Sequence, residues 1–324
     1  MAYHGYGVWS LVAQYILTAL IPALVFWFYI KWRPILIFSK QSFKELFSFG
    51  FYMFLTNLLN HFGQQIQGLL IGRFFNANTM GYYSKAHATE RVASQSISQV
   101  MSQVTYPLYA EVQDNREMLV YMLKRITTTL AYITFPLSFI LMLCARPIFL
   151  ILYGERWLPS VPYFQALCIA GLAFCLQSVN YQSIAAVGKS RIMFIWTVVK
   201  RTIGISAMVS GLLVWGMRGL LCGVIFSTWF AYLVNISLVS KYIGYKVHRQ
   251  LLDILPVMSA AGVCGACTYF ICHPLHLSLY FEGAVMMILY AFLYIGWSII
   301  FKPKAYTCFI DIMRNQCKHF KNKR

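Results

Sequence analysis

Polar side chains recur at helical spacing inside an apolar stretch near the start of the chain. They fall three or four positions apart, which places them along one side of a helix. They are Asn57, Asn60, His61, Gln64 and Gln67. Amide groups carry both hydrogen-bond donors and acceptors, so this stripe can bind a polar ligand or join the helix to a neighbouring helix.

A second stripe follows in the next segment, and it adds charged groups. Its polar members are Ser84, His87, Arg91, Gln95, Ser98, Ser102 and Thr105. The other side of that segment is mainly apolar, from Ala93 to Val104. Between the stripes the letters "GYYSKA", residues 81–86, predict the tight turn of a two-helix hairpin.

These stripes cannot face lipid, because an unpaired polar group in hydrocarbon costs several kcal/mol. They either form hydrogen bonds between helices or line a substrate path. The charges of Arg73, Lys85 and Arg91 beside Glu90 favour a path, since ionisable groups at membrane depth are usually functional. Two structural alternatives stay open: Glu90 can neutralise Arg91, and Arg73 and Lys85 can extend to the outer headgroups.

Enzyme chemistry has little support in this sequence. Only nine residues are acidic, and no paired carboxylates, metal-ligand cluster or nucleophile–base arrangement is evident. No Walker-type loop is present, so ATP bound to this chain is not expected to drive any transport. The "CGAC" motif at Cys264–Cys267 has redox or zinc spacing, but no second motif completes it, and small-residue helix packing is the favoured interpretation. We expect no catalytic residue, no metal and no cofactor.

The elements that position these residues are membrane helices. The chain is 59% hydrophobic and 11% charged, whereas soluble domains average about 45–50% and about 25%. A crossing helix needs about 20 apolar residues. The nine predicted spans are Val8–Ile30, Phe47–Phe74, Tyr82–Tyr106, Ile126–Ala145, Tyr163–Val187, Ile192–Gly216, Leu220–Val239, Leu251–Cys272 and Leu277–Phe301. The fold class is therefore all-α, a polytopic membrane helix bundle, with the polar third span the least apolar of the nine.

The distribution of basic residues predicts how the bundle faces. If the first span runs from outside to inside, 19 of the 27 Lys and Arg residues lie on the cytoplasmic side and 6 on the other. The net charge of +18 is thus explained by topology, and no nucleic acid partner is expected. Lys200 and Arg201 fall about ten residues into the sixth span; they are either intramembrane charges or markers of the inner interface, and the interface is favoured.

The order of motifs resembles the Wzx-type polysaccharide flippases of the MATE-like (multidrug/oligosaccharidyl-lipid/polysaccharide) superfamily. The segment "FKELFSFGFYMFLTNLLNHFGQQIQGLLIGRFF" followed by "MGYYSKA" is similar to the start of that family's second lobe. "YPLYAEVQDNREMLVYMLKR", "LYGERWLPSVPYFQAL" and "GVWSLVAQ" resemble three further family segments in the same order. The family often has Asp or Asn where this chain has Gln67, so proton coupling is expected to depend on Glu90 or on a residue outside this chain.

The resemblance implies a fold of two lobes around a central cavity. Residues 1–46 would be the last helix of the first lobe and a linker, 47–250 the second six-helix lobe, 251–301 two additional helices and 302–324 a basic tail. The odd span count and the outside start lead us to expect a C-terminal portion that does not transport by itself.

The function implied by the resemblance is translocation of undecaprenyl-pyrophosphate-linked oligosaccharides across the bacterial inner membrane for O-antigen, capsule or exopolysaccharide synthesis. Membrane lipids, a polysaccharide polymerase and export components are the candidate partners. The expected substrate-binding residues are Asn57, Asn60, Gln64, Gln67, Arg73, Lys85, Arg91 and Gln95. Two alternatives are a drug or lipid II exporter of the same superfamily, and an O-antigen polymerase or glycosyltransferase, which the short outer loops disfavour.

Overall fold

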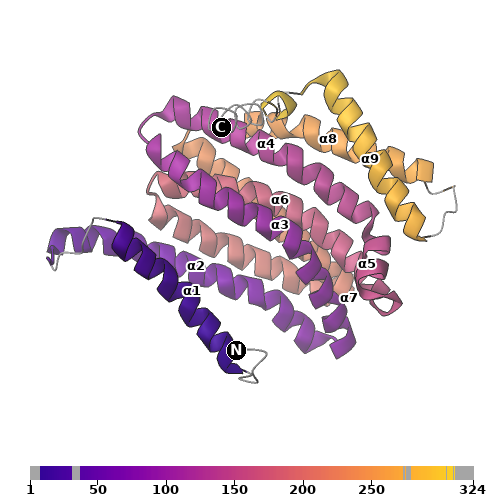
Figure 1. The fold of residues 1–324 in the computed structure, drawn as a ribbon, viewed down its shortest axis with the longest axis horizontal. Coiled ribbons are helices and arrows are strands. Elements are labelled where there is room, and N and C mark those ends of the chain that lie inside the picture. Colours follow the sequence, from indigo (N-terminus) through magenta and orange to yellow (C-terminus); the bar gives the residue numbers. More distant parts are fainter. Residues whose placement is uncertain are drawn as a thin grey trace. The chain divides into compact units, whose positions relative to one another are not determined.

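A computed structural model describes residues 8–30, 37–272, 274, 279–303, 305–308 and 310. The chain divides into two compact units, residues 1–47 and 48–324. The first unit holds α1 (Val8–Tyr29) and the beginning of α2 (Lys40–Phe74). The second holds the rest of α2 and the following elements (Figure 1): α3 (Ala77–Glu111), α4 (Arg116–Leu143), α5 (Ala145–Tyr153), the 3₁₀ helix η2 (Glu155–Ser160), α6 (Val161–Ala186), α7 (Ser190–Tyr242), α8 (Val247–Cys272) and α9 (Leu279–Phe301). No strand is assigned within the described ranges, and the predicted all-α fold class is confirmed.

Six helical segments are long and apolar enough to cross a membrane, in the part of the chain that the structure describes. They lie in α1, α4, α6, α7, α8 and α9, as is typical of a multi-pass membrane protein. Helices α2 and α3 are 35 residues each but too polar to meet that criterion, so their crossing of the membrane stays a prediction. The proposed division into a lobe and two additional helices stays a prediction as well.

Helix α7 contains both the sixth and the seventh predicted spans, joined by a sharp reversal. Trp215 and Gly216 leave the helical conformation, and Gly216 adopts a φ of +59° with a ψ of −134°, a combination that only glycine tolerates well. The two arms then run back against each other closely enough that a methyl group on Gly211 or Gly219 would overlap the backbone of the other residue. Glycines in an apolar sequence thus allow this helical hairpin to close.

The turn between α2 and α3 lies earlier in the chain than the sequence predicted. Gly81, Tyr82 and Tyr83 are inside α3, which begins at Ala77. The reversal occurs around Asn76, whose side chain accepts a hydrogen bond from the Thr79 backbone N–H at 2.8 Å. An Asn at this position accepts a hydrogen bond from one of the unpaired N–H groups at the start of a helix. Helix α3 therefore begins directly after Asn76, and the Gly-Tyr-Tyr sequence continues as helix.

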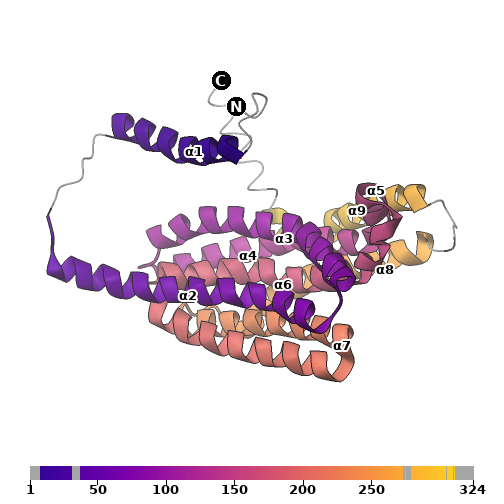
Figure 2. The same cartoon turned by 90° about the horizontal axis from the view of Figure 1, so that it is seen from below.

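Helix α6 lies between its neighbours at the centre of the second unit. Helices α3, α4 and α7 all pack against it, and the two cartoon views agree on this arrangement (Figures 1 and 2). Its buried residues include many small ones, among them Ala170, Gly171, Ala173 and Ser183. Small residues let helices approach closely, so α6 can contact three neighbours at once.

The "CGAC" motif is part of a helix-packing surface. Cys264 is buried and Cys267 is exposed, and both are free thiols. A methyl group at the neighbouring Gly265 would lie 3.6–3.8 Å from Phe139 and Leu143 of α4 and from Tyr290 of α9. The small residues of the motif therefore pack α8 against its two neighbours.

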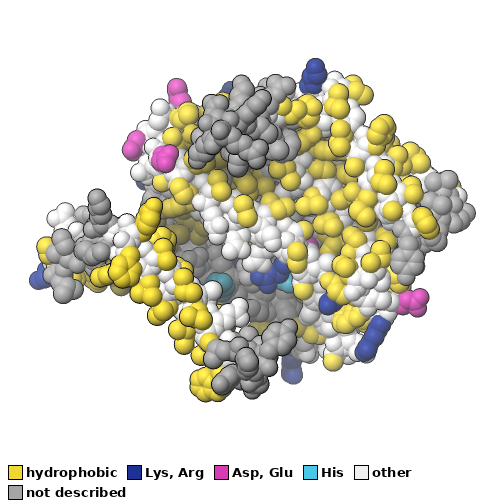
Figure 3. Space-filling view, in the orientation of Figure 1, with side chains coloured by type: hydrophobic (Ala, Val, Ile, Leu, Met, Phe, Trp, Pro, Cys, Tyr) yellow, Lys and Arg dark blue, Asp and Glu magenta, His cyan; other side chains and the backbone are white. Residues whose placement is uncertain are grey.

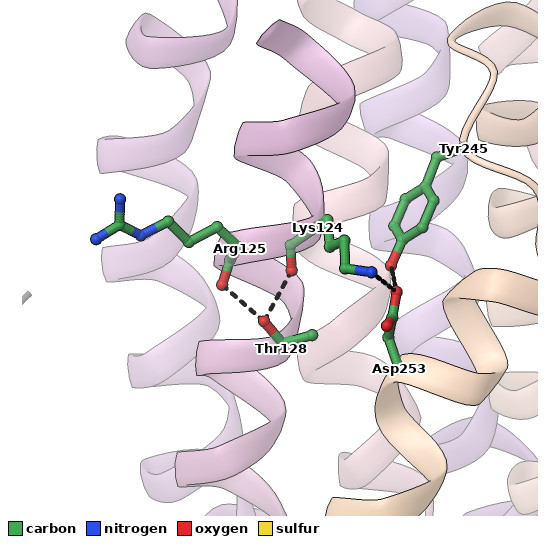
Figure 4. Close-up of polar contacts among 5 residues, drawn as sticks. All are labelled: Lys124, Arg125, Thr128, Tyr245 and Asp253. Carbon is green, nitrogen blue, oxygen red and sulfur yellow. Dashed lines mark hydrogen bonds and ion pairs between the residues drawn. The ribbon is translucent and has the colours of Figure 1, made fainter. Parts of the chain in front are cut away.

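One end of the α4–α8 pair is held by a cluster of polar contacts (Figure 4). Lys124 Nζ lies 2.8 Å from Asp253 Oδ2, and the Tyr245 hydroxyl donates to the same oxygen at 2.6 Å. Thr128, also drawn there, donates to the carbonyl oxygens of Lys124 and Arg125 within α4. Burial, and after it the hydrogen bond to Asp253, raise the pKa of Tyr245, so its hydroxyl stays a donor at neutral pH. These contacts connect α4, the α7–α8 loop and α8.

Candidate functional site

A polar cavity of about 160 Å³ lies among α2, α3, α6 and α7. One water molecule needs roughly 10–15 Å³ of such space, so the cavity can hold several. Most of its lining residues have polar or charged side chains. Apolar members such as Leu167, Phe174 and Val224 come from α6 and α7. The cavity is therefore suited to a hydrated or polar group.

Helix α3 contributes one face of polar and charged residues to the cavity. They are His87, Glu90, Arg91, Ser94 and Gln95. Their spacing of three and four positions brings them to one side of the helix. The Arg91 Nε donates to Gln95 Oε1 one turn further on. This pairing satisfies one guanidinium donor with a neutral acceptor, so the positive charge of Arg91 is retained.

Glu90 occupies the boundary between α3 and α6. Only 8% of its surface is exposed, and the Ser94 side chain lies next to its carboxylate. Gly171 of α6 lies directly opposite, and a methyl group there would overlap Glu90 Oε1. A glycine at this point of α6 therefore provides the space in which the carboxylate fits.

The first arm of α7 contributes two adjacent cations, Lys200 and Arg201. Lys200 is 8% exposed, and its Nζ donates to Asn235 Oδ1 at 2.8 Å. Arg201 Nη2 donates to Asn60 Oδ1 of α2 at 2.9 Å. Each cation is thus held by a neutral amide oxygen from a different helical segment.

The charges that line the cavity are unbalanced. Arg91, Lys200 and Arg201 are cationic, and Glu90 is the one carboxylate among the lining residues. Within the described ranges the one carboxylate ion pair is Lys124–Asp253, so none of the three cavity cations has a carboxylate within 4.0 Å. A buried charge is stable only when it is paired or hydrogen bonded. Lys200 and Arg201 meet this condition through neutral amide oxygens, which leaves their positive charge available to an anionic ligand.

The structure brings together six of the nine residues that the sequence predicted for the site. Asn60, Gln64 and Gln67 of α2 and Glu90, Arg91 and Gln95 of α3 all line the cavity. Gln67 Oε1 also accepts a hydrogen bond from the Tyr83 hydroxyl at 2.7 Å. The roles of these residues in substrate binding stay predictions.

The other three predicted site residues lie outside the cavity lining. Asn57 and Arg73 are exposed positions of α2. Lys85 is half-buried, with its Nζ 4.0 Å from the centre of the Tyr153 ring and 5.5 Å from that of Trp157. These distances are typical of cation–π contacts. The ammonium group of Lys85 therefore lies over rings of α5 and η2, outside the cavity lining.

Lys200 and Arg201 both line the internal cavity, and their position relative to the inner membrane interface stays a prediction. The signal was present in the sequence: two adjacent cations about ten residues inside an otherwise apolar segment. The predicted site did not include Gln177, Thr197, Ser227 and Thr228, which also line the cavity from α6 and α7. In addition, Ser98 and Thr105 of the predicted α3 stripe are buried and do not line the cavity.

The surface of the second unit over α4 and α9 is strongly apolar. In Figure 3 hydrophobic side chains cover most of the region over α4 and α9, while Lys, Arg and His side chains appear near the centre of the view among polar atoms. Such a surface is expected of helices that face lipid.

The sequence profile of the family described as "Polysaccharide biosynthesis protein" matches residues 1–162. The lipopolysaccharide biosynthesis protein WzxC of Escherichia coli (strain K12) is 25% identical over 265 residues, which are 78% of this chain and 54% of WzxC. The teichuronic acid biosynthesis protein TuaB of Bacillus subtilis (strain 168) is 29% identical over 166 residues, 51% of this chain and 34% of TuaB. The succinoglycan biosynthesis transport protein ExoT of Rhizobium meliloti (strain 1021) is 25% identical over 213 residues, 65% of this chain and 43% of ExoT.

A solved structure supports the fold. The lipid II flippase MurJ in its inward closed conformation aligns with a TM-score of 0.61 at 16% identity, over 84% of this chain and 57% of MurJ. This chain spans 34–54% of the length of the three curated relatives above. The relationship to polysaccharide flippases that the sequence motifs predicted is confirmed. With half of its length matched by the profile, the chain belongs to the polysaccharide biosynthesis protein family.

Proposed function

We propose that this chain takes part in moving lipid-linked oligosaccharides across the bacterial inner membrane, and that its cavity binds the diphosphate joining lipid and sugar. The observation that carries the proposal is the pair Lys200 and Arg201, which amide oxygens hold in the cavity and which has no carboxylate partner in the described part of the chain. Two adjacent cations match the two negative charges of a diphosphate diester. Charge-assisted hydrogen bonds to phosphate oxygens are among the strongest that proteins form.

The neutral polar residues of the cavity fit the other part of such a substrate. Asn60, Gln64, Gln67, Gln95 and Gln177 supply both donors and acceptors along the α2, α3 and α6 walls. Sugar hydroxyls need both kinds of partner when they leave water. The lipid chain would remain in the bilayer beside the apolar surface. A cationic drug is a poorer fit, because three cations and one carboxylate line the cavity.

Glu90 is the proposed proton-coupling residue. Its carboxylate contacts the cavity on one side and Ser94 and α6 on the other. A carboxylate so placed can gain or lose a proton as the surroundings change, and its charge would alter the anion affinity of the cavity. Coupling of this kind would link substrate release to proton uptake or loss.

Ligand-dependent thermal stability tests the proposal on the full chain in detergent. Farnesyl diphosphate should stabilise the protein, because a ligand that binds the folded state adds RT ln(1 + [L]/Kd), about 2.7 kcal/mol at 100 times Kd. Farnesol has the same lipid chain and no charge, so it serves as the matched control. Equal shifts in melting temperature with both compounds would contradict a diphosphate site.

We also propose an inner-membrane location with the C-terminus in the cytoplasm. The basic residues that support this orientation lie partly in 31–36 and 311–324, outside the described residues. A green fluorescent protein fused after Arg324 should fluoresce, and alkaline phosphatase fused at the same position should be inactive. Active phosphatase there would overturn the orientation.

A further inference from the structure

Two asparagines hold the cavity cations in place. Asn235 comes from the second arm of α7 and accepts from Lys200 Nζ, and Asn60 comes from α2 and accepts from Arg201 Nη2. Asn235 is buried, at 1% exposure. The two cations are neighbours in sequence, yet each has its own amide acceptor on a separate helical segment.

Stability alone does not explain an asparagine at position 235. Its side-chain Nδ2 is buried and has no hydrogen-bond partner among the residues that the structure describes, which costs free energy. An aspartate of the same shape would have no unsatisfied donor, and it would pair with Lys200 by charge. The amide therefore makes a weaker bond to the lysine than a carboxylate would. What the amide preserves is the net positive charge of the pair, because a carboxylate at position 235 would neutralise it.

Asn60 and Gly63 of α2 together determine where the Arg201 side chain lies. A methyl group on Gly63 would lie 2.7 Å from Arg201 Cδ and Nε, so the side chain rests directly on this glycine of α2. Asn60, one turn earlier, then accepts from the far end of the guanidinium. Gly63 fixes how near Arg201 lies to α2, and Asn60 fixes the direction of its Nη2.

We propose that Asn60, Gly63 and Asn235 are positioning residues, which hold Lys200 and Arg201 side by side as an uncompensated pair of positive charges for a diphosphate. This inference rests on the proposed function and specifies how the site selects its ligand. The neutral amide oxygens orient the cations without neutralising them. A carboxylate at position 60 or 235 would neutralise one cation and so compete with the negatively charged diphosphate.

The isosteric replacements Asn60→Asp and Asn235→Asp separate this role from a structural one. In each variant the Kd for farnesyl diphosphate should rise at least tenfold, while the melting temperature without ligand stays the same or rises. A residue that merely joins helices would be served as well by Asp, and its replacement would leave the Kd unchanged. Asn78→Asp is the matched control, since Asn78 is an exposed asparagine in the first turn of α3 and lies outside the cavity lining.

Two further variants keep the test decisive if a buried Asp prevents folding. Asn60→Ser retains a neutral acceptor and should bind within about threefold of the unaltered protein. Gly63→Ala should weaken binding several-fold by displacing Arg201, whereas Gly72→Ala should have no effect, because nothing lies within 4 Å of a methyl group there.

The outcomes distinguish the two proposals. If the unaltered chain binds farnesyl diphosphate no better than farnesol, the proposed function fails. If it binds selectively and loses binding on Lys200→Gln, but Asn60→Asp and Asn235→Asp bind normally, the proposed function stands and the positioning role is refuted. If the Asp variants do not fold, normal binding by Gly63→Ala would refute the positioning role.

Discussion

Replacing Lys200 and Arg201 together by glutamine is expected to reduce surface polysaccharide at least about 100-fold, with an unchanged amount of the protein in the membrane. Hydrogen bonds to charged groups contribute about 1.5–3 kcal/mol each, and every 1.4 kcal/mol is about tenfold in affinity. Glutamine keeps much of the length and the hydrogen-bonding capacity of both side chains, so the loss reports on charge. The measurement is the export of polysaccharide in the host strain, compared with the level of the protein in its membranes.

The control for this pair is Arg73→Gln. Arg73 is an exposed cation at the end of α2 and outside the cavity lining, so its replacement should change export less than threefold. Normal export by the double variant would show that the cavity cations do not contact the substrate. A comparable loss on Arg73→Gln would show that total positive charge, and not the cavity, controls export.

Glu90→Gln is expected to separate binding from transport. The affinity for farnesyl diphosphate should stay the same or increase several-fold, because the cavity loses its negative charge. Export should fall at least tenfold, because an amide can neither take up nor release a proton. Gln has the shape of Glu, so it fits the space opposite Gly171. Titration of ligand binding on the purified chain and export in the host strain provide the two measurements.

The contrasting hypothesis for Glu90 is that it only balances the charge of Arg91. In that case Glu90→Gln would alter binding and leave the transport step unaffected at saturating substrate. Glu155→Gln, at the exposed start of η2, is the matched control and should leave both quantities unchanged. Full export by Glu90→Gln would assign coupling to another residue.

The helices themselves were largely predictable from the sequence. Long apolar runs mark where helices lie, and the ends at Phe74, Cys272 and Phe301 coincide with the structure. The turn before α3 was misplaced because Gly-Tyr-Tyr has the composition of a turn, whereas the N-cap at Asn76 depends on one local hydrogen bond. The reversal in α7 was placed correctly, since Gly216 interrupts the apolar pattern.

The cavity was only half predictable. The walls formed by α2 and α3 were found because their polar residues repeat with the helical period. The walls formed by α6 and α7 carry only short polar patterns, such as Thr197 three positions before Lys200, inside long apolar helices. Which neighbour Lys200 faces is a matter of tertiary packing, and Asn235 becomes its partner only when the two arms of α7 close. Spacing along one helix cannot reveal that contact.

The most direct test of the account is to locate a bound polyprenyl diphosphate in an experimental structure of this chain. The account predicts phosphate oxygens about 2.7–2.9 Å from Lys200 Nζ and from the Arg201 guanidinium, the usual length of such charge-assisted hydrogen bonds. A diphosphate bound elsewhere, with the space between α2, α3, α6 and α7 filled by water or closed by side chains, would contradict it.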